Sequence, residues 1–302
     1  RAINSSKNNK ATGPDEIPCE IYKVINDDKA LKTLTGFFNN IYVNGCCPTQ
    51  WTKSVFIPIP KKRSAKTCND YRTISLMNHL LKIFLKVIHG RIYRKCEAYL
   101  SATQFVFRTG FGTREAFFGV NVLAQRCRDM SVDMYACFID FRKAFDRVKH
   151  ETLIQILVDI GLDGRDIRII ENLYWKQAAV VRIDGTETTA LNIKRGVRQG
   201  CILSPVLFNI YSEMIFRKAL SDKQEGIVVN GEVINNIWYA DDTVLIASSR
   251  EDLQSLLDCV VAKCEEAGLD LNITKTHVMV ISNQTNLRAN IRVGNIKLKQ
   301  VT

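Results

Sequence analysis

Apolar residues along this chain recur with both strand-like and helix-like spacing. Residues 134–139 form a compact apolar run that ends at Asp140, which predicts a strand with Asp140 at its C-terminal end. Helical spacing follows, and Gly161 is the predicted stop of that helix. The residues at i, i+3, i+4 and i+7 are Leu153, Ile156, Leu157 and Ile160.

Further elements are predicted on both sides of this strand. Asn230-Gly231 predicts a tight hairpin, because both residues tolerate positive φ. Ser249, with Asp252 three residues later, predicts the start of a helix. The remaining predictions are helices over much of 16–43, over 75–99 and from Ser204 onward, and strands at 55–59, 179–183 and 278–281. The order of elements from residue 134 onward indicates an α+β fold with a largely antiparallel sheet covered by helices.

The most informative stretch is Tyr239-Ala240-Asp241-Asp242, where two adjacent carboxylates lie between two short apolar runs. The runs, 237–239 and 244–247, are rich in β-formers and predict a hairpin with the carboxylates at its tip. Adjacent acids repel each other beside apolar strands unless a cation such as Mg²⁺ holds them. A solvated turn is the simpler alternative, because Asp is common in turns, and the tetrapeptide alone favours it.

The composition is that of a globular protein, with 46% hydrophobic and 24% charged residues among 302. The formal net charge of +11 favours polyanionic partners. Basic residues gather in the N-terminal third, where they form either a solvated surface or a contact for a phosphate backbone. They are Lys53, Lys61, Lys62, Arg63, Lys66, Arg72, Lys82, Lys86, Arg91, Arg94 and Lys95.

The chain has no run of 18 apolar residues and no apolar N-terminal segment, so neither a membrane span nor secretion is predicted. The ten cysteines include no C-x-x-C pair and the four histidines are scattered, which weighs against a zinc site. We therefore expect an intracellular protein with reduced, mostly buried thiols. The first residue is Arg, which predicts a piece of a longer polypeptide.

Asp140 offers the adjacent pair a third carboxylate. If its strand lies beside the hairpin, Asp140, Asp241 and Asp242 could hold two divalent ions about 3.5–4 Å apart, the usual two-metal separation. One ion would lower the pKa of an attacking hydroxyl, and the other would stabilise a leaving pyrophosphate. Nucleotidyl transfer needs this chemistry.

A series of motifs resembles the reverse transcriptase domain of non-LTR (LINE-type) retrotransposons, in the family's order. The motifs of the N-terminal extension and fingers are Lys10-Ala11-Thr12-Gly13-Pro14-Asp15, Ile59-Pro60-Lys61-Lys62, Asp70-Tyr71-Arg72-Thr73-Ile74-Ser75-Leu76, Gln104-Phe105-Val106-Phe107-Arg108 and Thr113-Arg114. The palm motifs are Phe138-Ile139-Asp140-Phe141-Arg142-Lys143-Ala144-Phe145-Asp146 (A), Arg195-Gly196-Val197-Arg198-Gln199-Gly200-Cys201-Ile202-Leu203-Ser204-Pro205 (B), Tyr239-Ala240-Asp241-Asp242 (C), and Gly268-Leu269 with Asn272, Lys275 and Thr276 (D). Each motif alone is weak, whereas the ordered series is specific.

The resemblance implies a right-hand polymerase with fingers and palm. We expect residues 1–130 to form the N-terminal extension and fingers, and residues 131–285 the palm, with part of the fingers interleaved near 150–200. Residues 286–302 would begin the connection to a primer grip and thumb. No Tyr-Leu-Gly primer-grip triplet is present, so the thumb is expected to be missing, as is the endonuclease of many relatives.

The resemblance also implies roles for individual residues. Asp140, Asp241 and Asp242 would be the catalytic ligands of two Mg²⁺ ions, with Mn²⁺ as a substitute. Lys275 would protonate or neutralise the pyrophosphate, with a surface charge as the alternative. The nucleotide-binding residues would be Lys61, Arg72, Lys143, Ala144, Phe145, Gln199 and Gly200.

Four of these roles have a physical basis in the residue type. Arg72 offers a bidentate fork and Lys61 a point charge to the triphosphate, although Lys62 and Arg63 are equally available. Backbone N–H groups near Lys143 and Ala144 suit phosphate oxygens. The Phe145 ring would crowd the sugar 2′ position and exclude ribonucleotides, with core packing as the alternative. Gly200, beside Gln199, lets the backbone approach a base pair closely.

Two positions depart from the family pattern. Val106 stands where the family usually has Gly, so a backbone that needs positive φ there would be strained. Thr73 replaces a frequent Pro, which is tolerable.

The predicted function is RNA-directed DNA polymerisation from a DNA primer or nicked target DNA, with an RNA template and deoxynucleoside triphosphates. The resemblance places such a protein in the nucleus and cytoplasm, with no membrane partner and an undefined oligomeric state. One alternative is another reverse transcriptase class such as a group II intron maturase, against which motif B and Ala144-Phe145-Asp146 argue. The other is a truncated or domesticated copy that binds RNA without polymerising, against which the three retained carboxylates argue.

Overall fold

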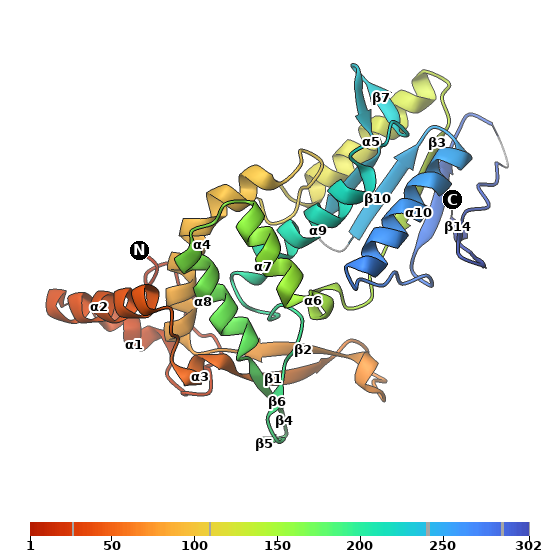
Figure 1. Ribbon diagram of the computed structural model, residues 1–302. Coiled ribbons are helices and arrows are strands. Elements are labelled where there is room, and N and C mark those ends of the chain that lie inside the picture. Colours follow the sequence, from red (N-terminus) through yellow and green to blue (C-terminus); the bar gives the residue numbers. More distant parts are fainter. Residues whose placement is uncertain (26, 109, 240–241, 285–286, 302) are drawn as a thin grey trace. The chain divides into compact units, whose positions relative to one another are not determined.

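The computed structural model describes residues 1–25, 27–108, 110–239, 242–284 and 287–301 (Figure 1). The chain divides into two compact units, each built from two separate stretches. Unit 1 comprises Arg1–Ala98 and Lys149–Leu207, and unit 2 comprises Tyr99–Val148 and Phe208–Thr302. Residues 99–130, which we expected to belong with the N-terminal part of the chain, therefore lie in unit 2. Each unit has its own sheet and is described by itself.

The sheet of unit 2 has the strand order β14-β11-β3-β10-β9. The strands are β3 (Met134–Ile139), β9 (Asn236–Tyr239), β10 (Asp242–Ala247), β11 (His277–Ile281) and β14 (Lys299–Val301). β3 pairs antiparallel with β10 and β11, and β10 pairs antiparallel with β9, whereas β14 is parallel to β11. The predicted α+β fold and the predicted strands in this region are confirmed.

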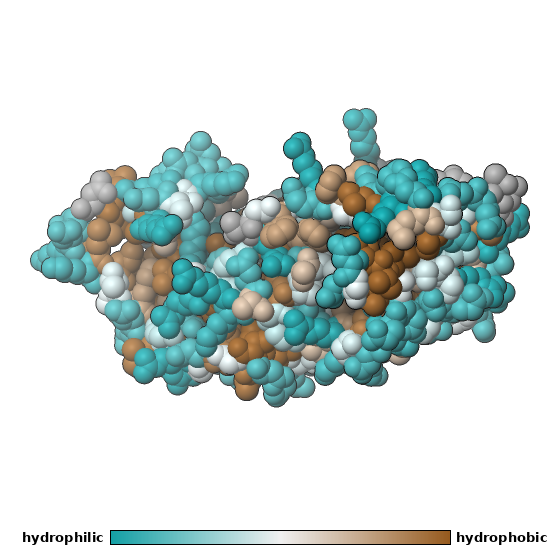
Figure 2. Space-filling view, turned by 90° about the horizontal axis from the view of Figure 1, so that it is seen from above, coloured by the Kyte–Doolittle hydropathy of each residue, from teal (hydrophilic) through white to brown (hydrophobic). Residues whose placement is uncertain are grey.

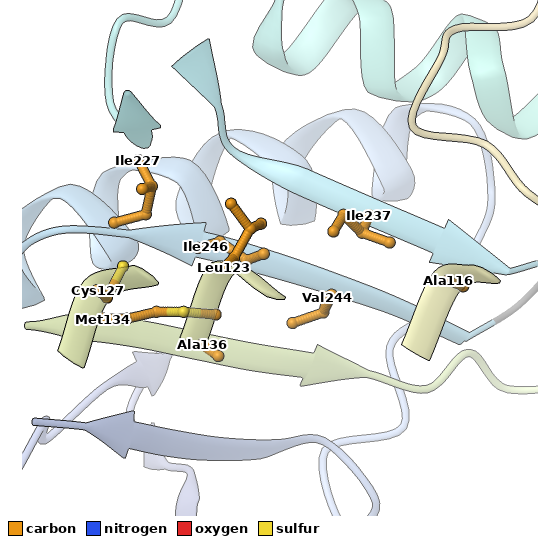
Figure 3. Close-up of a cluster of buried hydrophobic side chains, with 9 residues drawn as sticks. All are labelled: Ala116, Leu123, Cys127, Met134, Ala136, Ile227, Ile237, Val244 and Ile246. Atoms are coloured by element: carbon orange, nitrogen blue, oxygen red, sulfur yellow. The ribbon is translucent and has the colours of Figure 1, made fainter. Parts of the chain in front are cut away.

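One face of this sheet is covered by helix α5 (Thr113–Asp129), as Figure 3 shows. Side chains alternate between the two faces of a strand, so every second residue of β3 and β10 points towards α5. The buried cluster consists of Ala116, Leu123, Cys127, Met134, Ala136, Ile227, Ile237, Val244 and Ile246.

Helix α10 (Arg250–Glu266) contacts β10 and β3 from the opposite face of the sheet (Figures 1 and 3). Its N-terminus is capped as predicted, because the Ser249 side chain accepts a 3.1 Å hydrogen bond from the Asp252 N–H. Its buried stripe is Leu253, Leu256, Leu257, Val260 and Cys264. Helices α5 and α10 thus pack on opposite faces of the sheet in which β3 leads to Asp140 and β10 begins at Asp242.

The remaining elements of unit 2 are short, apart from α9 (Ser204–Leu220), whose residues from Phe208 onward belong here. They are α6 (Ala144–Arg147), the hairpin β7 (Ile227–Val229) with β8 (Glu232–Ile234), and the hairpin β12 (Arg292–Val293) with β13 (Ile296–Lys297). The predicted Asn-Gly turn joins β7 to β8, with φ of 52° at Asn230 and 86° at Gly231.

The sheet of unit 1 has β1 (Lys53–Pro60) between β2 (Tyr71–Leu76) and β4 (Ala178–Ile183), with β5 (Thr186–Glu187) and β6 (Leu191–Asn192) both paired to β4. β1 pairs antiparallel with β2 from Val55 to Pro60, whereas its parallel pairing with β4 runs from Lys53 and stops at Phe56. Pro58 and Pro60 explain this, because proline has no N–H to donate to a second neighbouring strand.

The helices of unit 1 are α1 (Cys19–Val24), α2 (Asp28–Asn44), α3 (Thr49–Thr52), most of α4 (His79–Tyr99), α7 (His150–Asp159) and α8 (Gly164–Trp175), with a 3₁₀ turn at Cys68–Asp70. The helix predicted over 75–99 begins later, since Ser75 and Leu76 complete β2. Gly13 approaches the backbone just before α4 closely, because a Cβ there would lie 2.4 Å from the Asn78 nitrogen.

Hydrophobic residues reach the surface in separate patches among hydrophilic side chains on the face shown in Figure 2. Exposed examples on α5 are Phe117 and Phe118, which are 67% and 69% exposed. All ten cysteines are free thiols, and six of them are buried. In the described part of the chain, no helix combines the length and apolar character needed to cross a membrane.

Candidate active site

The strand register of unit 2 brings Asp140 and Asp242 to the same end of neighbouring strands. Ile139, the last residue of β3, pairs with Thr243 of β10 in an antiparallel register. Asp140 follows Ile139 and Asp242 precedes Thr243, so the two acids continue the same register. Cα atoms of directly opposed residues in such a ladder lie about 4.5–5.5 Å apart. Asp242 begins β10 opposite Tyr239 of β9, so the predicted hairpin is confirmed. Ala240 and Asp241 lie outside the described residues.

A segment of motif D holds Asp140 in place. Asn272 Nδ2 donates a 2.8 Å hydrogen bond to Asp140 Oδ2, and the Asn272 N–H donates to the Asp140 carbonyl at 2.7 Å. The fully buried Thr276 adds a bond from its hydroxyl to the Asn272 carbonyl at 3.0 Å. One carboxylate oxygen of Asp140, Oδ2, is therefore held by Asn272, and the other, Oδ1, takes no part in this contact.

That other oxygen, Asp140 Oδ1, lies 3.7 Å from the ammonium of Lys275. The Lys275 side chain is 68% exposed, whereas that of Asp140 is 25% exposed. An exposed ion pair at this distance contributes little to stability. It does indicate that the second Asp140 oxygen accommodates a positive charge, with Lys275 close by.

The segment after Asp140 turns sharply. Lys143 is in the left-handed conformation, with φ 50° and ψ 48°, and α6 begins at the next residue. The half-buried Phe145 ring stacks on Phe208 with a centroid distance of 4.4 Å and an interplanar angle of 18°. Ala144, at 2% exposure, packs inward. Phe145 thus has a fixed orientation in unit 2, close in sequence to Asp140.

In unit 1, two of the predicted nucleotide-binding residues, Gln199 and Gly200, lie against strand β2, which also carries Arg72. The Ser75 N–H on β2 donates a 3.0 Å hydrogen bond to the Gln199 carbonyl, and Arg72 lies exposed on the same strand. Gly200 has φ of 99°, and a Cβ there would lie 3.4 Å from the Ser75 carbonyl oxygen. Glycine at position 200 therefore permits both this backbone conformation and the close approach to β2.

Lys61 follows β1 at the turn into the 3₁₀ segment. Its N–H donates to the Asp70 carbonyl at 2.8 Å, and its ammonium donates to the Asn69 carbonyl at 3.1 Å. The neighbouring Lys62 instead pairs with the Asp70 carboxylate at 2.7 Å. That hydrogen bond, together with those from the backbone of Lys66 and Thr67, lowers the pKa of Asp70.

The Val106 position is not strained. Positive φ in this motif falls at Phe107, at 52°, and Val106 is 1% exposed. The Val106 N–H donates to Gln104 Oε1 at 3.1 Å, and its carbonyl accepts from Asn209 Nδ2 at 2.8 Å. The condition under which a β-branched residue would be strained here is therefore not met, because the left-handed residue comes one position later.

The oxygen donors of this site fit a divalent ion. Carboxylates are the usual ligands of hard cations, and Asp140 Oδ1 already faces a cationic group. Within the described residues, no group of three or more His, Cys, Asp or Glu side chains lies close enough together to hold a metal. The third predicted ligand, Asp241, is outside that part of the chain.

Comparison with known proteins agrees with this geometry. Residues 59–297 match the family model described as Reverse transcriptase (RNA-dependent DNA polymerase). The Retrovirus-related Pol polyprotein from type-1 retrotransposable element R2 of Nasonia vitripennis is 28% identical over 271 residues, covering 90% of this chain and 26% of that protein. The RNA-directed DNA polymerase from mobile element jockey of Drosophila melanogaster is 27% identical over 287 residues, covering 91% and 30%.

Among solved structures, apo telomerase from Candida Tropicalis, truncated from its C-terminal domain, has a similar fold. The TM-score is 0.59 at 15% identity, and the match covers 89% of this chain and 57% of the telomerase chain.

The family match identifies a protein of the reverse transcriptase class, and an antiparallel sheet with two carboxylates at the same end of neighbouring strands is consistent with that class. The family match extends over most of the sequence, and the chain belongs to the reverse transcriptase family, as a domain of the non-LTR retrotransposon type. The chain spans 26% and 30% of the two relatives named above. Reverse transcriptases use divalent metal ions.

Proposed function

We propose that this domain catalyses RNA-directed DNA synthesis, adding deoxynucleotides to a primer 3′-hydroxyl. The observation that carries the proposal is the register that brings Asp140 and Asp242 together in a chain of this family. Unit 1 would act as the N-terminal extension and fingers, and unit 2 as the palm. The partners would be an RNA template, a DNA primer or nicked target DNA, and deoxynucleoside triphosphates.

The proposed mechanism gives each side chain a limited task. Two Mg²⁺ ions, or Mn²⁺ as a substitute, would supply the charge that activates the primer hydroxyl and stabilises the pyrophosphate. Asp140, Asp241 and Asp242 would bind them, and Asn272 would keep Asp140 oriented. Lys275 would neutralise or protonate the pyrophosphate.

The nucleotide-binding roles that the resemblance implies fall on residues of both units. The Arg72 guanidinium would bind phosphate oxygens in a bidentate manner and Lys61 would add a point charge. Gln199 and Gly200 would line the nucleotide site. In unit 2, backbone N–H groups near Lys143 and Ala144 would contribute to triphosphate binding.

Primer extension on an RNA template tests the proposal. We expect extension with Mg²⁺ or Mn²⁺, loss of extension on chelation, and recovery when either ion is restored. The parent protein and this domain should be compared in parallel. Nucleic-acid binding without extension in both would favour the alternative of a copy that binds RNA and does not polymerise.

Replacing Phe145 with Ala is expected to relax the selection against ribonucleotides. Removal of the ring would open space beside the sugar 2′ position, and steric discrimination of this kind is worth roughly 10- to 100-fold. The measurement is the ratio of kcat/KM for deoxynucleotide and ribonucleotide incorporation. If Phe145 only packs on Phe208, both values fall together and the ratio stays constant, which would contradict the assigned role.

Replacing Asn272 with Ala is expected to weaken metal binding and to leave the fold intact. Loss of the hydrogen bond to Asp140 Oδ2 frees the carboxylate to rotate, and such supporting contacts are worth roughly 10- to 100-fold in metal affinity or activity. The measurement is the Mg²⁺ concentration for half-maximal extension. Asn283→Ala, an exposed site in the same unit, is the matched control. An unchanged Mg²⁺ requirement in Asn272→Ala would remove this positioning role.

A further inference from the structure

Unit 1 contains a pocket of about 650 Å³ at the C-terminal end of α8. This volume is within the usual range for ligand sites, roughly 300–1,000 Å³. Its lining residues include Trp175 and four cations, Lys149, Lys176, Lys194 and Arg195, against one acid, Glu151. None of the residues to which we assign polymerase roles lines it.

The Trp175 ring is the unusual feature of this pocket. It is 44% exposed, whereas the other two tryptophans of the chain, Trp51 and Trp238, are 4% and 2% exposed. One of its neighbours is the buried His150 ring, at a centroid distance of 5.4 Å and an angle of 40°. A large aromatic surface is therefore presented to a pocket lined by cations.

His150 fixes this arrangement and does not add to its charge. Its Nε2 lies 2.9 Å from the Gly196 carbonyl oxygen, and the ring is 6% exposed. Burial lowers the pKa of His150, so the imidazole is neutral at neutral pH. The positive charge of the pocket comes from the lysines and the arginine.

A hydrogen bond between distant parts of the chain brings the two basic segments together. The Gln177 N–H donates to the Tyr174 carbonyl at 3.2 Å, and the Ile193 N–H donates to the Gln177 carbonyl at 2.9 Å. The second of these bonds joins the end of α8 to the segment after β6, and β6 itself pairs with β4. Lys176, Lys194 and Arg195 are exposed, and none forms an ion pair with an acid in the described part of the chain.

We propose that this pocket binds an unpaired segment of a polynucleotide strand, with one base stacked on Trp175 and adjacent phosphates on Lys176, Lys194 and Arg195. A base in a duplex has no free face for the ring, whereas an unpaired base does. Lysine and arginine free of acidic partners suit phosphate oxygens. The inference rests on the proposed function only in the choice of RNA as the first strand to test.

Tryptophan fluorescence offers a direct test, because Trp175 is the exposed tryptophan and the other two are buried. Titration with single-stranded oligouridylate is expected to quench the emission of the wild-type domain and not that of Trp175→Leu. Affinity is measured separately by anisotropy of labelled RNA. Trp175→Leu should bind roughly 5- to 150-fold more weakly, and Trp175→Tyr, which keeps a stacking ring, should stay close to wild type.

A charge variant tests the phosphate contacts without altering the aromatic ring. Lys176→Gln with Lys194→Gln should flatten the slope of log affinity against log salt by about 0.7 per lysine. Lys29→Gln with Lys32→Gln, on α2 of the same unit, removes equal charge away from the pocket and should leave the slope closer to wild type. Equal slopes in the two double variants would overturn the phosphate contacts.

Other ligands define the remaining outcomes. Single-stranded DNA that quenches as well as RNA supports a site for unpaired strands of either kind. Equal affinity for duplex RNA, or equal quenching by uridine monophosphate, overturns the proposal. Asp140→Asn keeps the pocket and should bind normally without extending a primer. Quenching in a domain that never extends a primer would support the pocket and reject the polymerase proposal. Primer extension together with unchanged RNA affinity in Trp175→Leu would support the polymerase proposal and reject the pocket.

Discussion

Replacing Asp140 with Asn is expected to reduce primer extension by about 10³-fold or more. The substitution keeps the size of the side chain and removes the negative charge that two divalent ions would need. Removal of a single electrostatic contact at a reaction centre already costs roughly 10²–10³ in kcat, and loss of a carboxylate ligand would also weaken binding of the ions themselves. The measurement is the single-turnover rate of deoxynucleotide addition on an RNA template.

A matched substitution separates this effect from a general change in charge or stability. Asp258→Asn removes an exposed carboxylate from α10 in the same unit, where it accepts a 2.8 Å hydrogen bond from Gln254. It is expected to extend primers at the wild-type rate. If Asp140→Asn, folded and purified, kept extension within a few-fold of wild type, the carboxylate chemistry assigned to this site would be wrong.

The sequence was sufficient to predict the strands that carry the active-site carboxylates. β3 and the β9–β10 hairpin are short apolar runs flanked by polar residues, because these strands are buried on both faces. Helix α5 was not predicted, and its exposed Phe117 and Phe118 explain why. When apolar residues lie on both the buried and the exposed face of a helix, the i, i+3, i+4 spacing of its buried stripe is hard to recognise in the sequence.

Helix α8 was also not predicted, although its signal was present. Asp163 caps it by accepting a hydrogen bond from the Arg165 N–H, and Ile169, Ile170 and Leu173 give it a buried stripe. Recognition of that helix would have brought Trp175 to its end, but not beside Lys194. That proximity depends on the pairing of β6 with β4.

The contact between Asn272 and Asp140 shows a similar limit for the active site. The sequence placed Asn272 in a motif without assigning it a task. The two residues are 132 positions apart, and they meet because β11 and β10 pair with β3 from either side. Residue spacing specifies neither strand order nor the hydrogen bonds that follow from it.

Replacing Arg198 with Ala is expected to lower the free energy of unfolding by about 3–5 kcal/mol. Arg198 is 3% exposed, and its guanidinium donates to the carbonyls of Trp51 at 3.0 Å and Leu173 at 2.6 Å. Burial without a carboxylate partner lowers the pKa of Arg198, so its removal relieves some desolvation. The unpaired carbonyls and the cavity left by the side chain outweigh that gain.

Denaturant unfolding of matched variants measures this contribution. Arg195→Ala removes an exposed arginine three residues earlier and is expected to change stability by less than about 0.5 kcal/mol. Arg198→Met, which restores volume and leaves the carbonyls unpaired, should fall between the two, and this separates the cavity from the hydrogen bonds. Equal stability of Arg198→Ala and Arg195→Ala would mean that the hydrogen bonds of the Arg198 guanidinium only offset the cost of its desolvation. In that case Arg198 would not be what joins α3 and α8 within unit 1.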